Sequence, residues 1–452
     1  MRHAVMLAMM LAGLGSGAHA AEPAAVLTLP EAVHQALAQN PKQISQRLDV
    51  DKAGAQQQAA RGAQWPTLDF NAAATRYGYP TFVYPIRDLS SLPPLDDTIY
   101  DYGVALRLPL YAGGRLTQGA TLADLGKQTA FERERLGVQE LTYNVSAVYL
   151  KIQHLMALEQ AYAARIASLE AQAKRVTLLR EVGRAPKLDQ LKTQGLLTKA
   201  RHDKLQIENR RREAWTLLYQ LMGQEKPVQE ITLTHYAAAP APTWSLERLR
   251  QEAGAQRPEL KIAEQQSAAG AAQEKIARGD RLPAVSLVSG YRERSGSDQQ
   301  FYDDWNVGVQ LTVPLLDGGV RRARVDEAAL ARQQAGQAIE QTRLEVAKQV
   351  QDAWDAHAEA ASRLQVTANS VEESSEALSI ETLKYEQGVG VTTDLLNAES
   401  ALLTAQADRL QAQFDLIITR FNLLRASGAL SPEGAATLVA PDTGREVEGN
   451  KP

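Results

Sequence analysis

The chain of 452 residues contains no cysteine. This absence excludes disulfides, thiolate metal sites, a cysteine nucleophile and a lipid anchor on an N-terminal cysteine. Aromatic residues are also scarce at 6%, whereas alanine supplies about one residue in six, which favours helices with few bulky core anchors. With a net charge of −4 the chain has no excess of basic residues, so nucleic acid is not an expected partner.

Long apolar runs are missing as well. At the N-terminus, Met1-Arg2-His3 precede a short apolar stretch at positions 4–14, and small residues follow, ending in Ala18-His19-Ala20. This order is typical of a signal peptide, residues 1–20, cleaved after Ala20. A membrane anchor, the alternative, needs about 18 apolar residues. We therefore expect a mature protein that works outside the cytoplasm, with any membrane crossing made by strands.

Self-comparison reveals two copies of one pattern. Segment 60–66, Ala-Arg-Gly-x-x-x-Pro, recurs at 277–283, whereas segment 109–114, Pro-Leu-x-x-Gly-Gly, recurs at 314–319 with a smaller offset. A single insertion between the two segments of the first copy explains the changed offset. The expected organisation is a first repeat 21–223, a linker or equatorial segment 224–243, a second repeat 244–428 and a mobile tail 429–452.

Each copy is predicted to contain a helix, a β-hairpin, a very long helix and a further helix. Residues 115–182 and 320–387 contain no proline, and at 1.5 Å per residue each would form a helix about 100 Å long. The hairpins are expected at about 67–109 and 284–314. The fold class is therefore mainly α with a β-hairpin in each repeat.

The hairpin strands alternate in polarity. In residues 305–313 every odd position is apolar and every even position is small or polar, which predicts a strand with one oily face. Nine to eleven residues are also the length of a transmembrane β-strand. An ordinary amphipathic hairpin docked on a soluble core is the alternative. The expected lipid-facing side chains are Trp305, Val307, Val309, Leu311, Val313, Tyr102, Val104, Leu106 and Leu108.

A closed transmembrane barrel would require several chains. Two hairpins supply four strands, and the smallest membrane barrels use about eight. Two chains would give eight strands and a filled interior, whereas three would give twelve and room for a channel. We favour the trimer.

The chain resembles the TolC family of outer-membrane efflux proteins. The resemblance rests on L-x-x-A-x-x-x-A-x-x-x-N-P at 29–41, the repeated Pro-Leu-x-x-Gly-Gly, and V-G-x-x-x-x-x-D at 182–189. It implies a homotrimer with a 12-stranded transmembrane β-barrel in outer-membrane lipid and a 12-helix periplasmic α-barrel. It also implies a periplasmic adaptor protein and an inner-membrane transporter of RND, ABC or MFS type as partners.

The expected function is a passive outer-membrane channel-tunnel that exports substrates in a tripartite efflux or type I secretion system. The sequence leaves open which of the two systems it serves and what it transports. A secreted or periplasmic coiled-coil structural or adaptor protein without a channel is the alternative function.

The resemblance further implies a gate at the tips of the helical hairpins. Asp394 stands at the position of a gate carboxylate and Tyr385 at that of a constricting tyrosine, whereas Asn397 replaces a second acid. Three copies of Asp394 would form a negative ring that favours cations. Alternatively, Asp394 only stabilises a helix start, with Thr392 or Thr393 as N-cap. Asp189 is a further gate candidate, and adaptor docking is expected at the turns containing Gly183, Pro186, Gly388 and Gly390, the last of which replaces a basic residue of the gate.

Motifs for catalysis are incomplete. Residues 114–119 have the glycine spacing of a P-loop but no lysine follows, and Gly388-Val389-Gly390 lacks the third glycine of a dinucleotide motif. The seven histidines form no H-E-x-x-H or neighbouring ligand pair. We therefore expect no catalytic residues, no cofactor and no metal site.

Overall fold

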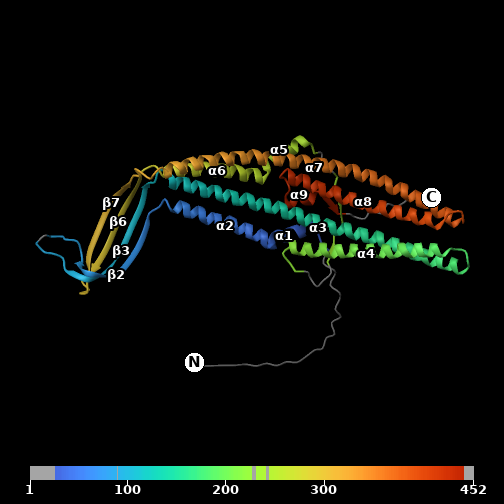
Figure 1. Cartoon of the computed structure of the whole chain (residues 1–452), viewed down its shortest axis with the longest axis horizontal. Helices are drawn as coiled ribbons and strands as arrows, with labels where there is room; N and C mark the ends of the chain where they lie inside the picture. The colour runs from blue at the N-terminus through green and yellow to red at the C-terminus, as the bar shows by residue number, and fades with distance from the viewer. Residues whose placement is uncertain (1–25, 89, 226–230, 241–243, 442–452) are drawn as a thin grey trace, which may run out of the picture.

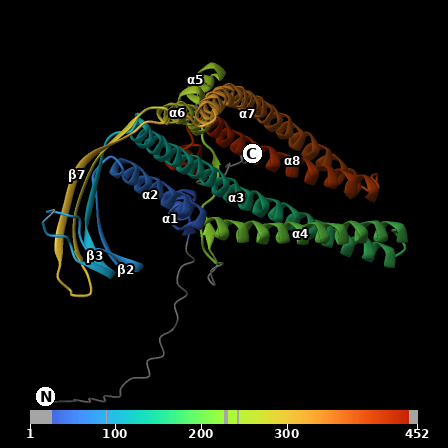
Figure 2. The ribbon, with the colours of Figure 1, turned by 60° about the vertical axis from the view of Figure 1, so that its left-hand side comes forward.

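The computed structural model describes residues 26–88, 90–225, 231–240 and 244–441. The predicted signal peptide, residues 1–20, lies outside the described residues. The molecule is elongated, with a curved β-sheet at one end and two helical hairpin tips at the other (Figures 1 and 2).

The helices fall into two matching sets. The long helices α3 and α7 have 67 residues each, about 100 Å at 1.5 Å per residue, as predicted from the absence of proline. No helix within the described ranges is long and apolar enough to cross a membrane. The first set is α1 (Leu29–Gln39), α2 (Pro41–Gly62), α3 (Arg115–Glu181) and α4 (Lys187–Leu221); the second is α5 (Leu246–Gln256), α6 (Pro258–Gly279), α7 (Val320–Glu386) and α8 (Thr392–Ala426).

Glycines with a positive φ angle stand at equivalent turns of both copies. The pairs are 113 and 318, 114 and 319, 183 and 388, and 223 and 428, all with the same offset as the repeated Pro-Leu-x-x-Gly-Gly segment. A Cβ on Gly223 would lie 2.4 Å from the carbonyl oxygen of Gln39, and one on Gly428 would lie 3.0 Å from the amide nitrogen of Arg257. Glycine thus lets α4 end against the α1–α2 junction and α8 end against the α5–α6 junction.

Four helical columns lie side by side. Helices α2 and α4 both pack along α3, and α6 and α8 both pack along α7. Helix α3 also packs against α6 and α8, so the order across the layer is α2/α4, α3, α6/α8 and α7 (Figure 1). The outer columns are therefore α2/α4 on one side and α7 on the other.

The β-sheet has four antiparallel strands in the order β2-β3-β6-β7. The strands are β2 (Thr67–Phe82), β3 (Leu95–Tyr111), β6 (Ala284–Ser295) and β7 (Tyr302–Thr312). Strand β7 ends one residue before the predicted Val313. Within the described ranges, β2 and β7 each pair on one side only, so the sheet of the single chain has two free edges.

The main core lies midway along the molecule and contains residues from both ends of the chain. Two small sheets cover it: β1 (Val26–Leu27) pairs with β4 (Thr232–Leu233), and β5 (Tyr236–Ala238) pairs with β8 (Val439–Pro441). The side chains that fill it come from both repeats and include Leu29, Val33, Tyr149, Leu218 and Phe421, each no more than 2% exposed.

The segment after Gly428 differs from the prediction of a mobile tail. Residues 429–441 contain α9 (Pro432–Thr437), capped by the side chain of Ser431, and strand β8. Leu430, Leu438 and Val439 are buried in the core. A helix of six residues is too short to show an apolar period, which is why the sequence pattern missed it. Residues 442–452 lie outside the described residues.

Candidate functional site

The strand register places the predicted lipid-facing side chains on one face of the sheet. Val104 lies opposite Tyr291, and Tyr291 lies opposite Trp305. In an antiparallel sheet directly opposed residues share a face, and every second residue returns to it. Tyr102, Leu106 and Leu108 therefore share the face of Trp305, Val307, Val309 and Leu311.

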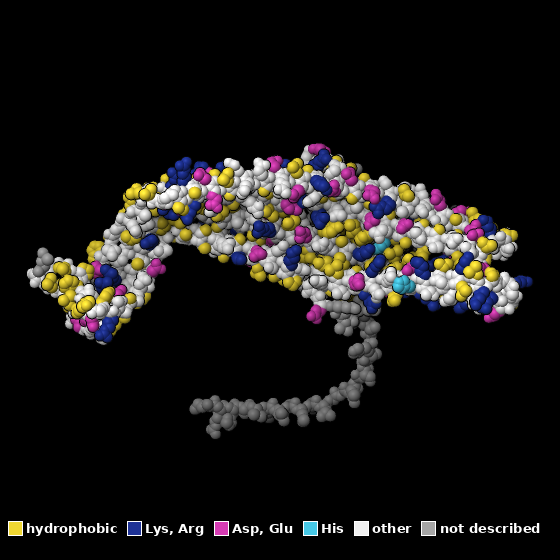
Figure 3. Space-filling view, viewed as in Figure 1, with side chains coloured by type: hydrophobic (Ala, Val, Ile, Leu, Met, Phe, Trp, Pro, Cys, Tyr) yellow, Lys and Arg dark blue, Asp and Glu magenta, His cyan; other side chains and the backbone are white. Residues whose placement is uncertain are grey.

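This apolar face is open in the single chain. Trp305, Val307, Val309 and Leu311 on the edge strand β7 are 62–68% exposed, and Phe70 on the opposite edge is 68% exposed. Tyr102 and Val104 on the inner strand β3 are less exposed, at 38% and 39%. Hydrophobic side chains accordingly gather at the sheet end of the space-filling view (Figure 3).

Polar groups also occur on this face, at the end of the strands far from the helices. The Tyr102 hydroxyl donates to Glu293, and the Tyr291 hydroxyl donates to the other carboxylate oxygen of Glu293 at 3.2 Å. Nearby, the rings of Tyr84 and Tyr302 lie 4.3 Å apart, and Arg87 binds Asp303 at 3.1 Å. The loop of the first hairpin thus contacts the second hairpin at this end.

The opposite face of the sheet is polar and forms a groove of about 590 Å³. Arg292 donates to one carboxylate oxygen of Asp304 from two nitrogens, at 3.0 and 2.8 Å. Gly103 is the residue opposite Arg292, and a Cβ there would come within 2.6 Å of the arginine side chain. Asp69, Asn71, Asp101, Arg107 and Asn306 also line the groove.

The helical tips are built on two glycine turns. Gly183 and Gly388 adopt φ angles of 73° and 78°. Gly390 follows in the second turn, where its amide donates to the carbonyl of Lys384 at 3.0 Å and a Cβ would lie 2.9 Å from the amide nitrogen of Tyr385. The turn therefore leaves little room for a side chain at position 390.

Asp394 and Asn397 project from the start of α8. Both are exposed and, three residues apart, they lie on the same side of the helix. Tyr385 lies in the last turn of α7 and is half-buried. Among the described residues, no side-chain hydrogen bond or ion pair joins Asp394 to Tyr385 or Asn397, so the single chain does not assemble these three residues into a network.

The helix starts at the tips lack side-chain caps. Val391 is the N-cap of α8 and Pro186 that of α4, and neither makes a capping hydrogen bond. The predicted cap at Thr392 or Thr393 is therefore wrong, because α8 already begins at Thr392. Asp394 and Asp189 each stand in the first helical turn, where a carboxylate favourably meets the helix dipole.

Contacts between the two coiled coils near the tips were missed by the sequence reasoning. Arg165 on α3 forms a buried ion pair with Glu399 on α8, and Ser168 donates to the same carboxylate at 3.0 Å. Lys192 on α4 donates to Thr393 at 3.1 Å. Partners 201–234 residues apart leave no local pattern by which a sequence would reveal them. Leu169, Leu197, Ala200 and Leu396 form an apolar cluster between the same helices.

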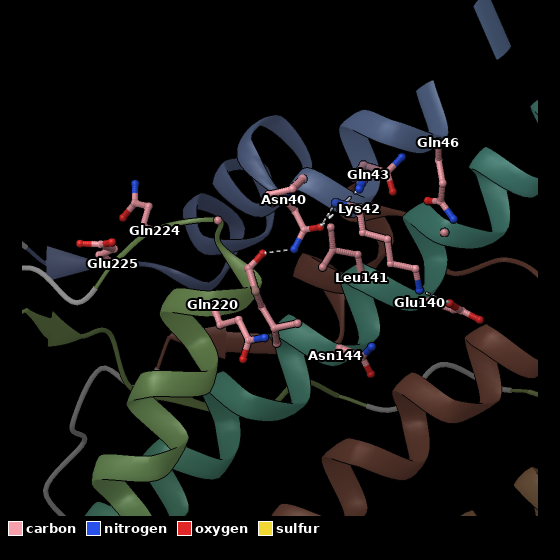
Figure 4. Close-up of a pocket in the computed structure, with 14 residues that line it drawn as sticks. Asn40, Lys42, Gln43, Gln46, Glu140, Leu141, Asn144, Gln220, Gln224 and Glu225 are labelled. Carbon is pink, nitrogen blue, oxygen red and sulfur yellow. Dashed lines mark hydrogen bonds and ion pairs between the residues drawn. The ribbon is translucent and has the colours of Figure 1, made fainter. Parts of the chain in front are cut away.

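A second groove, of about 580 Å³, lies where α2 begins and α4 ends. Asn40 accepts from the amide of Lys42 at 2.9 Å and donates to the carbonyl of Leu221 at 2.9 Å, so one side chain caps both helices (Figure 4). Gln43 is 1% exposed and its amide nitrogen has no partner among the described residues. The groove therefore lies at a helix junction that Asn40 connects.

His154 is the most buried histidine described. It stacks on Phe414 at 5.4 Å, and burial lowers its pKa to about 4. His357 on α7 contacts Thr419 at 3.2 Å, and burial lowers its pKa as well. The described residues contain no group of three or more His, Asp or Glu that could hold a metal ion.

Comparison with known proteins finds a matching family model. The model described as outer membrane efflux protein matches residues 32–224 and 249–429. The chain is 26% identical over 410 residues to the outer membrane protein OprJ of Pseudomonas aeruginosa. The aligned region covers 87% of this chain and 82% of OprJ. It is 27% identical over 323 residues to the alkaline protease secretion protein AprF of the same species, covering 68% of this chain and 66% of AprF.

Solved structures share the fold. The outer membrane protein VceC of Vibrio cholerae superposes with a TM-score of 0.75 at 18% identity, covering 88% of this chain and 96% of VceC. The open MtrE outer membrane channel of Neisseria gonorrhoeae gives 0.75 at 19% identity, covering 89% and 90%. At these identities the likeness concerns the fold.

Proposed function

Because the chain belongs to the outer membrane efflux protein family, we propose that three copies of it form a passive duct through the outer membrane and periplasm. The chain is an outer-membrane channel component of an efflux or secretion system. The trimer, the gate and the partner proteins are the parts of this proposal that experiment must test.

The proposal rests mainly on the β-sheet, which has one apolar face and two free edges. The unpaired backbone N–H and C=O groups on the free edges of β2 and β7 need hydrogen-bond partners. In lipid no water can supply them, so another strand must. Pairing β7 of one copy with β2 of the next satisfies both edges. Three copies give twelve strands, with Trp305, Val307, Val309, Leu311, Tyr102 and Val104 toward lipid and the groove of Arg292 and Asp304 toward the lumen.

The helices extend this barrel into a tunnel. Each copy contributes four columns, so three copies give twelve, and α3 and α7 set a length of about 100 Å. We propose that Asp394, with Asn397, faces the lumen at the narrow end and that Tyr385 and Asp189 take part in closing it. Three Asp394 carboxylates would favour cations there.

The partners follow from the same assignment. An inner-membrane transporter would drive export through the duct, and we place the periplasmic adaptor at the tips, at Gly183, Pro186, Gly388 and Gly390. Relatives are named for toluene efflux, as in TtgI of Pseudomonas putida, and for protease secretion, as in AprF. The transporter class stays open between RND, ABC and MFS types. A catalytic role is not proposed.

Fractionation and conductance test the duct. The mature protein, expected to start after Ala20, should be recovered with outer membranes, run as a trimer in native mass spectrometry and form channels in planar bilayers. Recovery in the soluble periplasmic fraction would favour the coiled-coil structural protein instead. A trimer without conductance would contradict the duct while leaving the assembly intact.

A further inference from the structure

The two coiled coils carry opposite charge. Residues 156–222, which contain α4 and the end of α3, hold 13 Lys and Arg against 7 Asp and Glu. The equivalent residues 361–427 of the second repeat hold 5 against 9. One coil therefore has a net charge of +6 and the other of −4, although their backbones match. In Figure 3, Lys and Arg are seen along the α4 edge.

Helix α4 has an exposed row of side chains opposite its packed face. Thr193, Leu197, Ala200 and Ile207 are buried along its tip-side half, and Leu197 and Ala200 pack with Leu169 of α3. A position five residues away lies about 140° around the helix. Leu188, Leu205 and Arg212 stand at this distance from Thr193, Ala200 and Ile207, and Leu191, two residues before Thr193, lies about 160° around. Leu188, Leu191 and Leu205 are 58%, 58% and 51% exposed, and Arg212 is exposed too; we name these four residues the α4 outer row.

Helix α7 has a matching row. Val346, Val350 and Ala360 are its buried residues. On the other side, Val366, Ile380 and Leu383 are 66%, 46% and 56% exposed, and Glu359, with 70% of its side chain exposed, continues the row. These four residues form the α7 outer row.

The spacings of the two rows are mirror images. From the tip upward, the α4 row stands at positions 188, 191, 205 and 212. The α7 row, read from the tip as 383, 380, 366 and 359, has the same intervals in the reverse chain direction. Because α4 leaves the tip and α7 approaches it, an antiparallel alignment sets Leu188 by Leu383, Leu191 by Ile380, Leu205 by Val366 and Arg212 by Glu359.

We infer that the α4 outer row of one copy packs against the α7 outer row of a second copy of this chain, in this register. The inference rests on the proposed assembly: if β7 pairs with β2 of the next copy, the outer columns α7 and α2/α4 must meet. Intervals of three residues and of whole heptads, as in both rows, are typical of a coiled-coil seam. Repeated around a threefold axis, such a heterologous contact closes into a ring.

Charge supports the second copy as the occupant. Glu372, Glu373 and Glu376 make no ion pair within the described residues. The alignment brings Glu372 opposite Lys199, an exposed side chain that pairs with Asp203 at 2.7 Å within its own helix. Glu359 binds Arg363 at 2.7 Å, and Arg363 also binds Asp415 at 3.0 Å. Glu359 can therefore pair with Arg212 of the second copy while Arg363 keeps Asp415 as its partner. Two coils of the same net charge would repel each other, whereas the coil of +6 and the coil of −4 attract, and the Arg212–Glu359 pair favours one register.

Disulfide trapping tests the register, and the natural absence of cysteine keeps the background clean. The full-length double variant Leu205→Cys/Val366→Cys, purified in detergent and mildly oxidised, should give covalent dimers and trimers on denaturing gels. The matched control Leu205→Cys/Leu344→Cys also uses an exposed α7 residue, but one about 33 Å further along the helix, and should remain monomeric. Each single-cysteine variant should stay monomeric too.

The outcomes separate this inference from the proposed function. The seam is contradicted if the protein is a conducting trimer but forms no 205–366 disulfide, or forms the 205–344 disulfide equally well. Either result would still be consistent with the proposed duct. Loss of both trimer and conductance in the unsubstituted protein overturns the duct itself.

A charge exchange provides a second, cysteine-free measurement. Arg212→Glu and Glu359→Arg should each lower the salt concentration at which half of the trimer dissociates, about twofold, and the combined exchange should restore it. A double variant no better than the singles would show that the two residues are not neighbours.

Discussion

The two repeats of this chain share a backbone and differ in surface. Long helices of 67 residues and second arms of 35 residues recur in both copies, and the positive-φ glycines recur at a constant offset. The charges of the coiled coils, by contrast, have opposite sign. The comparison teaches that duplication keeps the residues that shape turns, while the faces that meet different neighbours are free to diverge.

The helix junctions show the same division at the level of single residues. Asn40 donates to the carbonyl of Leu221, the last residue of α4. Its counterpart Arg257 donates at 3.1 Å to Ala426, the equivalent residue of α8, and adds bonds to Glu259 at 2.7 Å and Gln349 at 2.6 Å. An uncharged cap and a buried cation thus perform the same connection with different chemistry.

The largest expected effect comes from the glycines that both copies retain. Gly223→Ala places a Cβ 2.4 Å from a backbone oxygen at a φ of 72°, and should lower the free energy of unfolding by more than about 3 kcal/mol. Gly428→Ala, with its nearest atom at 3.0 Å, should cost less. The control Gly126→Ala, in open space on α3, should be neutral or stabilising by up to about 1 kcal/mol. Thermal unfolding measures all three, and equal losses at 223 and 428 would contradict the close-approach argument.

The next largest difference between the repeats is expected in the stability loss at the helix-junction residues Arg257 and Asn40. Arg257→Ala removes a buried guanidinium and leaves several acceptors without a donor, so a loss of about 2–3 kcal/mol is expected. Asn40→Ala removes an N-cap and should cost about 1 kcal/mol. Urea unfolding of the two variants provides the comparison. A larger loss for Asn40→Ala would show that the uncharged cap is the stronger of the two.

Histidines on the two long helices should respond unequally to acid. The pKa of His154 falls to about 4 in the folded chain from 6.5, so the unfolded chain binds more protons between these values. Stability should therefore decrease as pH falls from 6.5 toward 4, by about 2 kcal/mol at pH 5. His154→Phe should remove most of that slope, and His357→Phe less, because His357 is only half-buried. Unfolding midpoints between pH 7 and 5 test this, and an unchanged slope in His154→Phe would contradict it.

The smallest expected effect concerns the tips. If three Asp394 carboxylates line the narrow end, Asp394→Asn should reduce cation-over-anion permeability about twofold in planar bilayers. Asp189→Asn is the matched change at the equivalent first turn of α4 and should alter permeability less. Identical ion preference in Asp394→Asn and the unsubstituted protein would assign Asp394 to the helix dipole alone.

Local patterns predicted most of the fold. Proline-free stretches located α3 and α7 within one residue, and strict alternation located β7 and its apolar face. The pattern failed for α9 and β8, whose short lengths show no period; α9 packs against α1, and β8 pairs with β5. At the tips, the first-turn positions of Asp394 and Asp189 were predictable, whereas the Arg165–Glu399 pair was not, because its partners are 234 residues apart and adjacent only after the two coils pack.

The closing segment of the chain sets the order of maturation. Helix α9 packs against α1 and α3, so the last described turns of the protein complete a core that begins at Leu29. Contacts of such high sequence separation form slowly, because a long loop must close before they contribute. During export these contacts cannot form until residues 429–441 have crossed as well. The protomer's core is thus completed only once its C-terminal residues have arrived, and a truncated product would lack part of it.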